Sequence, residues 1–197
     1  MSQTLVYLFS ASGVTANAAK ILAQAARADL YEIKPEVPYT RADLNWMEKK
    51  SRSTVEMNDP SSRPAINGKI ERMEQYQNIF IGFPIWWYRE PSIIDTFLES
   101  YDFTGKRVIL FATSGGSGLG KTDEGVKKIV PGAKVENGRM LNGNVSEADV
   151  KAGTEPEFIE KREKLKTWGV IRIEKCMTPM ILPVMHQSPG QCFKWAE

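Results

Sequence analysis

Residues 5–15 read LVYLFSASGVT, and this stretch decides how the chain folds. The apolar run at 5–9 mixes aliphatic, β-branched and aromatic residues, which is typical of a strand covered on both faces. Small and hydroxyl-bearing residues follow at 10–15, and a helix is predicted over 15–28. The apolar positions Ala18, Ile21, Leu22 and Ala25 recur at helical spacing, so one face of this helix should pack against a sheet.

The alternation of strand and helix continues toward residue 150. Further strands are predicted at 30–33, 78–83, 106–112 and, more weakly, 134–141. Helices are predicted at 42–55, at 91–101, in the stretch before Pro131, and from about Ser146. Right-handed crossovers between parallel strands place helices on both faces of the sheet. The sequence therefore predicts an α/β fold with a doubly wound, five-stranded parallel sheet.

Composition limits the classes of function. The chain has 197 residues, of which 42% are hydrophobic and 25% charged, as in an average globular domain. No apolar run approaches the ~20 residues that span a bilayer, and the start lacks the basic flank of a signal peptide, so the cytoplasm is expected. The 26 basic and 24 acidic residues form no basic block, which argues against nucleic acid as a partner.

The last part of the chain does not continue the alternation of strands and helices. Residues 153–197 are predicted to be a C-terminal extension of unknown role, attached to a domain at 1–152. The extension holds Cys176, His186 and Cys192, whose spacing matches no zinc site, so no metal is expected. Its methionines and aliphatic residues could cover an apolar patch on this domain or on a second copy, which leaves a homodimer open.

Three loops follow predicted strands and should open on the same edge of the sheet. We name them the first loop (residues 10–15), the aromatic loop (residues 84–88) and the glycine-rich loop (residues 113–120). Parallel α/β sheets bind ligands at the carboxyl ends of their strands. The three loops are therefore the candidate site.

The first loop joins a strand to a helix. Its backbone N–H groups and hydroxyls gather where the helix dipole favours an anion, so the loop could hold a phosphate without a cation. An ordinary helix cap formed by Ser12 or Thr15 is the alternative.

The aromatic loop carries three consecutive aromatic residues, Trp86, Trp87 and Tyr88. Buried core is the usual place for such side chains. Consecutive residues cannot all point inward from one element, so the pattern favours a flat platform for a conjugated ring.

The glycine-rich loop raises a rival interpretation. Residues 115–122 read GGSGLGKT, which matches the Walker A pattern between a strand and a helix, as in a P-loop nucleotide hydrolase. Such enzymes use an acidic residue at the end of a neighbouring strand to help hold Mg²⁺. No predicted strand ends in Asp, although Asp29 and Glu32 flank or lie within the second strand. The helix after Lys121 is also short.

Taken together, the three loops resemble those of the flavodoxin family, in particular short bacterial flavodoxin-like proteins with a Pro-Ile-Trp-Trp segment after the third strand. The resemblance covers about residues 5–150. It rests on LFSASGVT at 8–15, GFPIWW at 82–87, TFLE at 96–99 and FATSGGSG at 111–118. It implies a flavodoxin-like sandwich with the strand order 2-1-3-4-5.

The resemblance also implies FMN as the cofactor. The phosphate would be bound by Ser10, Ser12, Gly13, Val14 and Thr15. The isoalloxazine would be bordered or stacked by Pro84, Ile85, Trp86, Trp87 and Tyr88. Its polar edge would contact Thr113, Ser114, Gly115, Gly116, Ser117 and Gly118. No side chain is needed as catalytic acid or base, because the flavin carries the chemistry.

The expected function is electron transfer, or NAD(P)H-dependent reduction of a small acceptor such as a quinone. The partner would be a small molecule or a redox protein, with no role for a membrane. Residues 1–150 hold 18 basic and 18 acidic side chains, unlike the strongly acidic electron-carrier flavodoxins. Long-range steering toward a basic redox protein is therefore expected to be weak.

Overall fold

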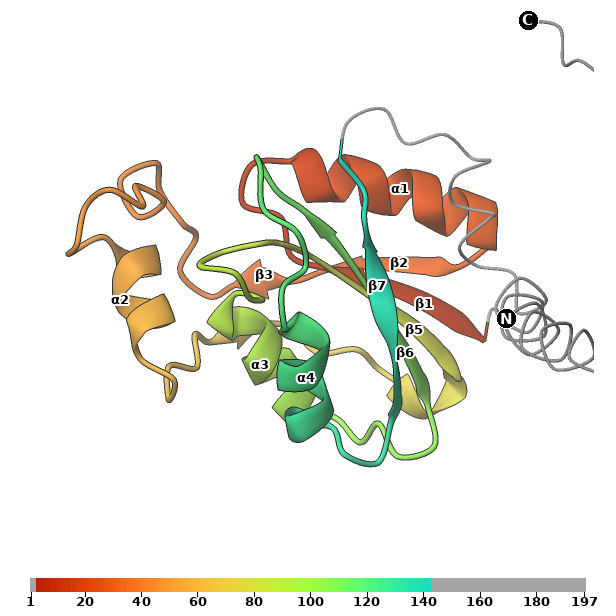
Figure 1. The fold of residues 1–197 in the computed structure, drawn as a ribbon. Helices are drawn as coiled ribbons and strands as arrows, with labels where there is room; N and C mark the ends of the chain where they lie inside the picture. Colours follow the sequence, from red (N-terminus) through yellow and green to blue (C-terminus); the bar gives the residue numbers. More distant parts are fainter. Residues whose placement is uncertain (1–2, 143–197) are drawn as a thin grey trace, which may run out of the picture. The chain divides into compact units, whose positions relative to one another are not determined.

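The computed structural model describes residues 3–142 and contains a five-stranded parallel sheet (Figure 1). Its strands are β1 (Thr4–Leu8), β2 (Asp29–Glu32), β5 (Asn78–Pro84), β6 (Arg107–Thr113) and β7 (Lys134–Met140). They lie in the order β2-β1-β5-β6-β7, and every neighbouring pair is parallel. In chain order of the five strands this is 2-1-3-4-5, so the predicted fold class and strand order are confirmed.

Helices cover both faces of the sheet. α1 (Val14–Ala26) lies on one face, and α3 (Ser92–Glu99) and α4 (Thr122–Ile129) lie on the other (Figure 1). Alternate side chains of β1 pack on opposite faces of the sheet. Val6 and Leu8 belong to the core under α1, and Leu5 and Tyr7 belong to the core under α3 and α4. The strand is apolar throughout because both of its faces are buried.

A lobe built from residues 36–65 lies beyond the carboxyl ends of the strands and carries α2 (Arg52–Asn58) (Figure 1). At its base, β3 (Lys34–Pro35) pairs antiparallel with β4 (Ile66–Asn67), and the short 3₁₀ helix η1 (Met73–Gln75) precedes β5. The chain therefore enters and leaves the lobe beside the sheet.

The predicted helix at 42–55 is wrong over most of its length, because residues 41–50 form turns. Side chains there bind nearby backbone in place of helical hydrogen bonds. Asp43 Oδ2 accepts from the Thr40 backbone N–H at 2.8 Å, and Asn45 Oδ1 accepts from the Met47 N–H at 3.2 Å. Such local bonds compete with a helix. α2 begins only after Ser51, whose hydroxyl accepts from the Thr54 N–H.

Several sequence predictions lie outside the described residues. They are the helix from Ser146, the boundary at 152, the extension at 153–197 and the separation of its cysteines and histidine. Within residues 3–142, no helix is long and apolar enough to cross a membrane.

Candidate functional site

The three predicted loops follow β1, β5 and β6, which are neighbours in the sheet, and they contact one another. The hydroxyls of Thr15 and Thr113 form a hydrogen bond of 2.8 Å, and both residues are buried. The Ile85 N–H donates to the Thr113 carbonyl at 2.8 Å. A Cβ on Gly120, where φ is +60°, would lie 2.8 Å from the Tyr88 carbonyl oxygen. The structure thus brings the loops into one site.

The first loop is arranged to receive an anion. Ser10 Oγ accepts from the N–H groups of Gly13 at 3.1 Å and Ala16 at 3.2 Å, which folds the loop over the start of α1. Gly13 is the N-cap residue with φ of +87°, a conformation that favours glycine. The N-cap position is Gly13 and the first-turn N–H of Ala16 is bonded by Ser10, so the alternative of a cap by Ser12 or Thr15 is wrong.

The charge at this helix start also suits an anion. The first turn of α1 contains no acidic residue, and Ser12, Gly13 and Val14 are exposed. The positive end of the helix dipole therefore faces solvent without a neighbouring carboxylate to oppose it. The residues present fit a phosphate group.

The aromatic loop ends in a tight turn that presents two aromatic side chains. Trp86 and Arg89 exchange backbone hydrogen bonds of 3.0 and 3.1 Å, which leaves Trp87 and Tyr88 as the two turn residues. Their φ values are +46° and +66°. Turns of this type favour Asn-Gly, and positive φ at bulky residues is strained. Such strain is concentrated at functional sites.

The three aromatic residues do not act alike. Trp87 is 38% exposed and Tyr88 76% exposed, whereas Trp86 is half-buried and packs on the core. The Trp86 ring meets the Phe9 ring edge-on, with 5.7 Å between centroids and an interplanar angle of 89°. An exposed platform at this loop would therefore be formed by Trp87 and Tyr88, with Trp86 as its support.

The lobe contributes a residue that the sequence analysis missed. The Tyr39 ring lies 5.5 Å from that of Trp86 at 80° and 5.6 Å from that of Phe9, so the three rings pack against one another. Its hydroxyl donates to Glu56 at 2.6 Å, and Arg52 lies 4.0 Å above its ring. Burial and then the bond to Glu56 raise the pKa of Tyr39, which keeps the hydroxyl protonated. The only feature of the sequence that could have identified Tyr39 is that it is an aromatic residue within a polar segment.

Serine side chains fix the conformation of the glycine-rich loop. Ser114 Oγ accepts from the N–H groups of Gly116 at 3.2 Å and Ser117 at 2.9 Å. The Ser114 N–H donates to Asn142 Oδ1 at 2.8 Å. Gly115, Gly116 and Gly118 are exposed, so a ligand could approach their backbone closely.

The helix that follows this loop is poorly suited to a phosphate. The first turn of α4 contains Asp123 and Glu124, whose charges already interact with the helix dipole. Thr122 is buried, and its hydroxyl donates to the Leu119 carbonyl at 2.5 Å. A Walker A threonine needs that hydroxyl for Mg²⁺. The geometry argues against the P-loop interpretation.

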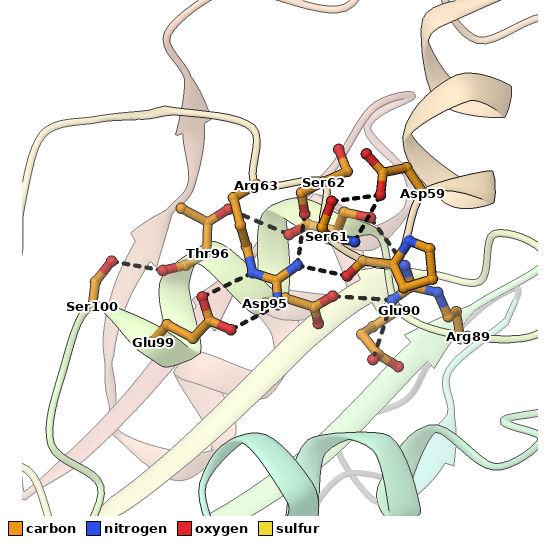
Figure 2. A network of polar contacts seen from close by, with 12 residues as sticks. Asp59, Ser61, Ser62, Arg63, Arg89, Glu90, Asp95, Thr96, Glu99 and Ser100 are labelled. Atoms are coloured by element: carbon orange, nitrogen blue, oxygen red, sulfur yellow. Dashed lines mark hydrogen bonds and ion pairs between the residues drawn. The ribbon is translucent and has the colours of Figure 1, made fainter.

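Two buried carboxyl groups and the partly buried Arg89 follow the turn in the chain. Figure 2 shows Arg89, Glu90 and Asp95 gathered at the start of α3. Arg89 Nη1 lies 3.0 Å from Asp95 Oδ2 and 3.6 Å from Glu90 Oε1. Burial raises the pKa of both carboxyl groups, and Arg89 opposes that shift at Asp95. The sequence analysis assigned these residues no role.

Comparisons with known proteins agree with the fold and identify the family. A family model described as Flavodoxin matches residues 3–157. A protein of Bacteroides eggerthii assigned as a flavoprotein is 49% identical, with 78% of this chain and 96% of that chain covered and a TM-score of 0.74. A similar protein of Bacteroides uniformis is 48% identical, with 77% and 97% covered and a TM-score of 0.73.

A more distant similarity extends the agreement in fold. A flavoprotein of Lactobacillus acidophilus in complex with FMN is 19% identical, with 79% of this chain and 100% of that chain covered and a TM-score of 0.60. No curated protein matches the chain.

Proposed function

The chain belongs to the flavodoxin family, and on that premise we propose that it binds FMN across its three loops and acts as a redox flavoprotein. The observation that carries the proposal is the contact between loops. The buried pair of Thr15 and Thr113 hydroxyls joins the loop suited to phosphate to the loop suited to a ring edge. A ligand with both parts fits this arrangement.

The first loop would bind the FMN phosphate. The exposed start of α1 offers N–H groups and the dipole, and Ser10, Ser12 and Thr15 offer hydroxyls. The pair of Thr15 and Thr113 shares one hydrogen bond between two hydroxyls, so one of the two protons can still be donated to the ligand.

The other two loops would hold the isoalloxazine. Trp87 and Tyr88 would border or stack on the ring, and Trp86, fixed by Phe9 and Tyr39, would support them. The backbone of residues 113–118, with Pro84 and Ile85 beside it, would contact the polar edge. When bound, FMN supplies hydride and single-electron transfer chemistry, which requires no catalytic acid or base from the chain.

For the reaction we favour NAD(P)H-dependent reduction of a small acceptor such as a quinone over electron transfer to a protein. Residues 1–150 carry 18 basic and 18 acidic side chains, so long-range attraction of a charged protein partner would be weak. In the overall reaction a hydride equivalent passes from NAD(P)H to the quinone, which also takes one proton from water and becomes the hydroquinone, while the nucleotide leaves as NAD(P)⁺.

The test is a visible absorption spectrum of the purified full chain after FMN is added and excess is removed by gel filtration. A retained flavin spectrum supports the cofactor, and its bleaching by NADH or NADPH with recovery on addition of a quinone supports the reaction. Retention of flavin without reduction by either nucleotide would contradict the proposed enzymatic activity and favour an electron carrier. A chain that retains no flavin would contradict the proposal.

A further inference from the structure

Two buried carboxyl groups at the start of α3 have no role in the function proposed above. Glu90 and Asp95 are each 3% exposed. Within residues 3–142, Glu90 Oε2 and Asp95 Oδ1 are buried and have no hydrogen-bond partner. An unpartnered buried oxygen is costly, and most of all when it carries charge.

One guanidinium serves both carboxyl groups. Arg89 approaches Asp95 at 3.0 Å and Glu90 at 3.6 Å. The lobe adds Arg63, which acts on Asp95 but is engaged by Glu99 through hydrogen bonds of 2.7 and 2.8 Å (Figure 2). α4 packs on Glu90 with the uncharged Gly125. The positive charge beside the pair is therefore enough for one carboxylate, and the other is favoured in its neutral form.

Glu90 is the group that keeps the proton. Asp95 has the closer guanidinium, whose hydrogen bond lowers its pKa against the effect of burial. Burial, followed by the neighbouring charge of Asp95, raises the pKa of Glu90 to about 7. The proton would be held below that pH and released above it.

Hydrogen bonds of Arg89 connect this pair to the turn at Trp87 and Tyr88. Arg89 closes the turn through its two backbone bonds with Trp86, and its side chain binds Asp95 and the Ser92 hydroxyl at 3.0 Å. Ser92 in turn donates to the Glu56 carbonyl at 3.2 Å, which connects the turn to the lobe. The strained residues Trp87 and Tyr88 thus depend on Arg89 for their position.

We propose that Glu90 and Asp95 hold one proton between them, and that this proton keeps the turn at Trp87 and Tyr88 in the conformation that binds the flavin ring. The inference rests on the proposed function, because it concerns how tightly the same isoalloxazine ring is bound. When Glu90 ionises, two carboxylates compete for Arg89 and the buried site favours opening toward water. Opening moves the turn and weakens cofactor binding.

The sign of the pH effect follows from this linkage. The binding conformation requires the protonated pair, so FMN affinity falls as the pH rises above about 7, beyond the range in which the FMN phosphate passes its own second ionisation at about pH 6. For one linked proton the dissociation constant rises by at most about tenfold per pH unit.

The experiment compares FMN dissociation constants of the full chain from pH 5.5 to 9 in wild type, Glu90→Gln, Asp95→Asn and Asp102→Asn. The first two variants each remove one of the competing charges, so their profiles should diverge from wild type above pH 7 and stay flatter. Asp95→Asn carries the same test if Glu90→Gln does not fold. Asp102→Asn is the control, since Asp102 is an exposed carboxylate before β6 that accepts from the Thr104 N–H and lies outside the Arg89 network. It should follow the wild type.

A second measurement does not involve the cofactor. Carboxyl ¹³C NMR of flavin-free, glutamate-labelled protein should show one resonance that titrates near pH 7 and is absent in Glu90→Gln. That resonance in a protein that binds no FMN would support the proton-holding pair while the proposed function fails. Wild type and both carboxyl variants with the same FMN profile would overturn the inference and leave the function intact. Glu90 titrating near pH 4.5 would overturn it as well.

Discussion

Two loops of this chain follow a central strand, begin a helix and match a phosphate-binding pattern. The first loop leads into α1, and the glycine-rich loop leads into α4. α1 begins without an acidic residue, whereas the first turn of α4 carries Asp123 and Glu124. The better pattern match, GGSGLGKT, is therefore at the helix start less suited to an anion.

The threonine hydroxyls differ in the same direction. Thr15 bonds to Thr113 across the site, while the hydroxyl of Thr122 is used within its own turn by the Leu119 carbonyl. A motif supplies residue types, but charge in the first helical turn and the partners of the hydroxyls decide whether an anion can bind. Substitutions in matched pairs can break or sharpen this contrast.

The largest effect is expected for Thr15→Val compared with Thr122→Val. Loss of a hydrogen bond to a charged group costs about 1.5–3 kcal/mol, so Thr15→Val should weaken FMN binding by about 10- to 150-fold. Thr122→Val should lower stability by about 1 kcal/mol and change the FMN dissociation constant less than about threefold. Quenching of flavin fluorescence measures both constants. Equal losses in the two variants would remove the contrast between the loops.

A smaller effect is expected for Gly13→Ala compared with Gly116→Ala. Gly13 has φ of +87°, whereas Gly116 is outside the positive-φ region and has open space at its Cβ. The left-handed conformation costs an alanine about 1–2 kcal/mol, which should appear in the free energy of unfolding of Gly13→Ala by urea. Gly116→Ala should change it by less than about 0.5 kcal/mol. The reverse order would contradict the account of how α1 begins.

The smallest effect is expected for Lys121→Ala. Lys121 is exposed and precedes the first turn of α4, whose acidic residues repel a phosphate. We therefore expect no FMN phosphate beside this lysine. The FMN dissociation constant should change less than about threefold, or about 0.6 kcal/mol, in the same fluorescence titration. A loss near that of Thr15→Val would place the phosphate at the glycine-rich loop instead.

The sheet could be predicted from the sequence because its strands are apolar on both faces. The run at residues 5–9 and its counterparts at 78–83 and 106–112 were enough to place β1, β5 and β6, and with them the three loops. The lobe was predicted poorly, because the bonds of Asp43 and Asn45 to nearby backbone replace a helix whose composition is otherwise acceptable.

The finer arrangement of the site could not be predicted. Trp86 and Trp87 are chemically identical neighbours, yet Trp86 packs against the core, whereas Trp87 has positive φ and is exposed. The pairing of Glu90 with Asp95 depends on where α3 begins. Because the helix begins at Ser92, its first turn places the Asp95 carboxyl group near that of Glu90. Both features depend on backbone geometry that residue type alone does not specify.

The most direct test of the contrast between the two loops is a pair of calorimetric titrations of the wild-type chain, one with FMN and one with Mg-ATP. The account predicts one FMN site and no heat of binding with Mg-ATP. Binding of Mg-ATP that Lys121→Ala abolishes, in a chain that binds no FMN, would contradict it.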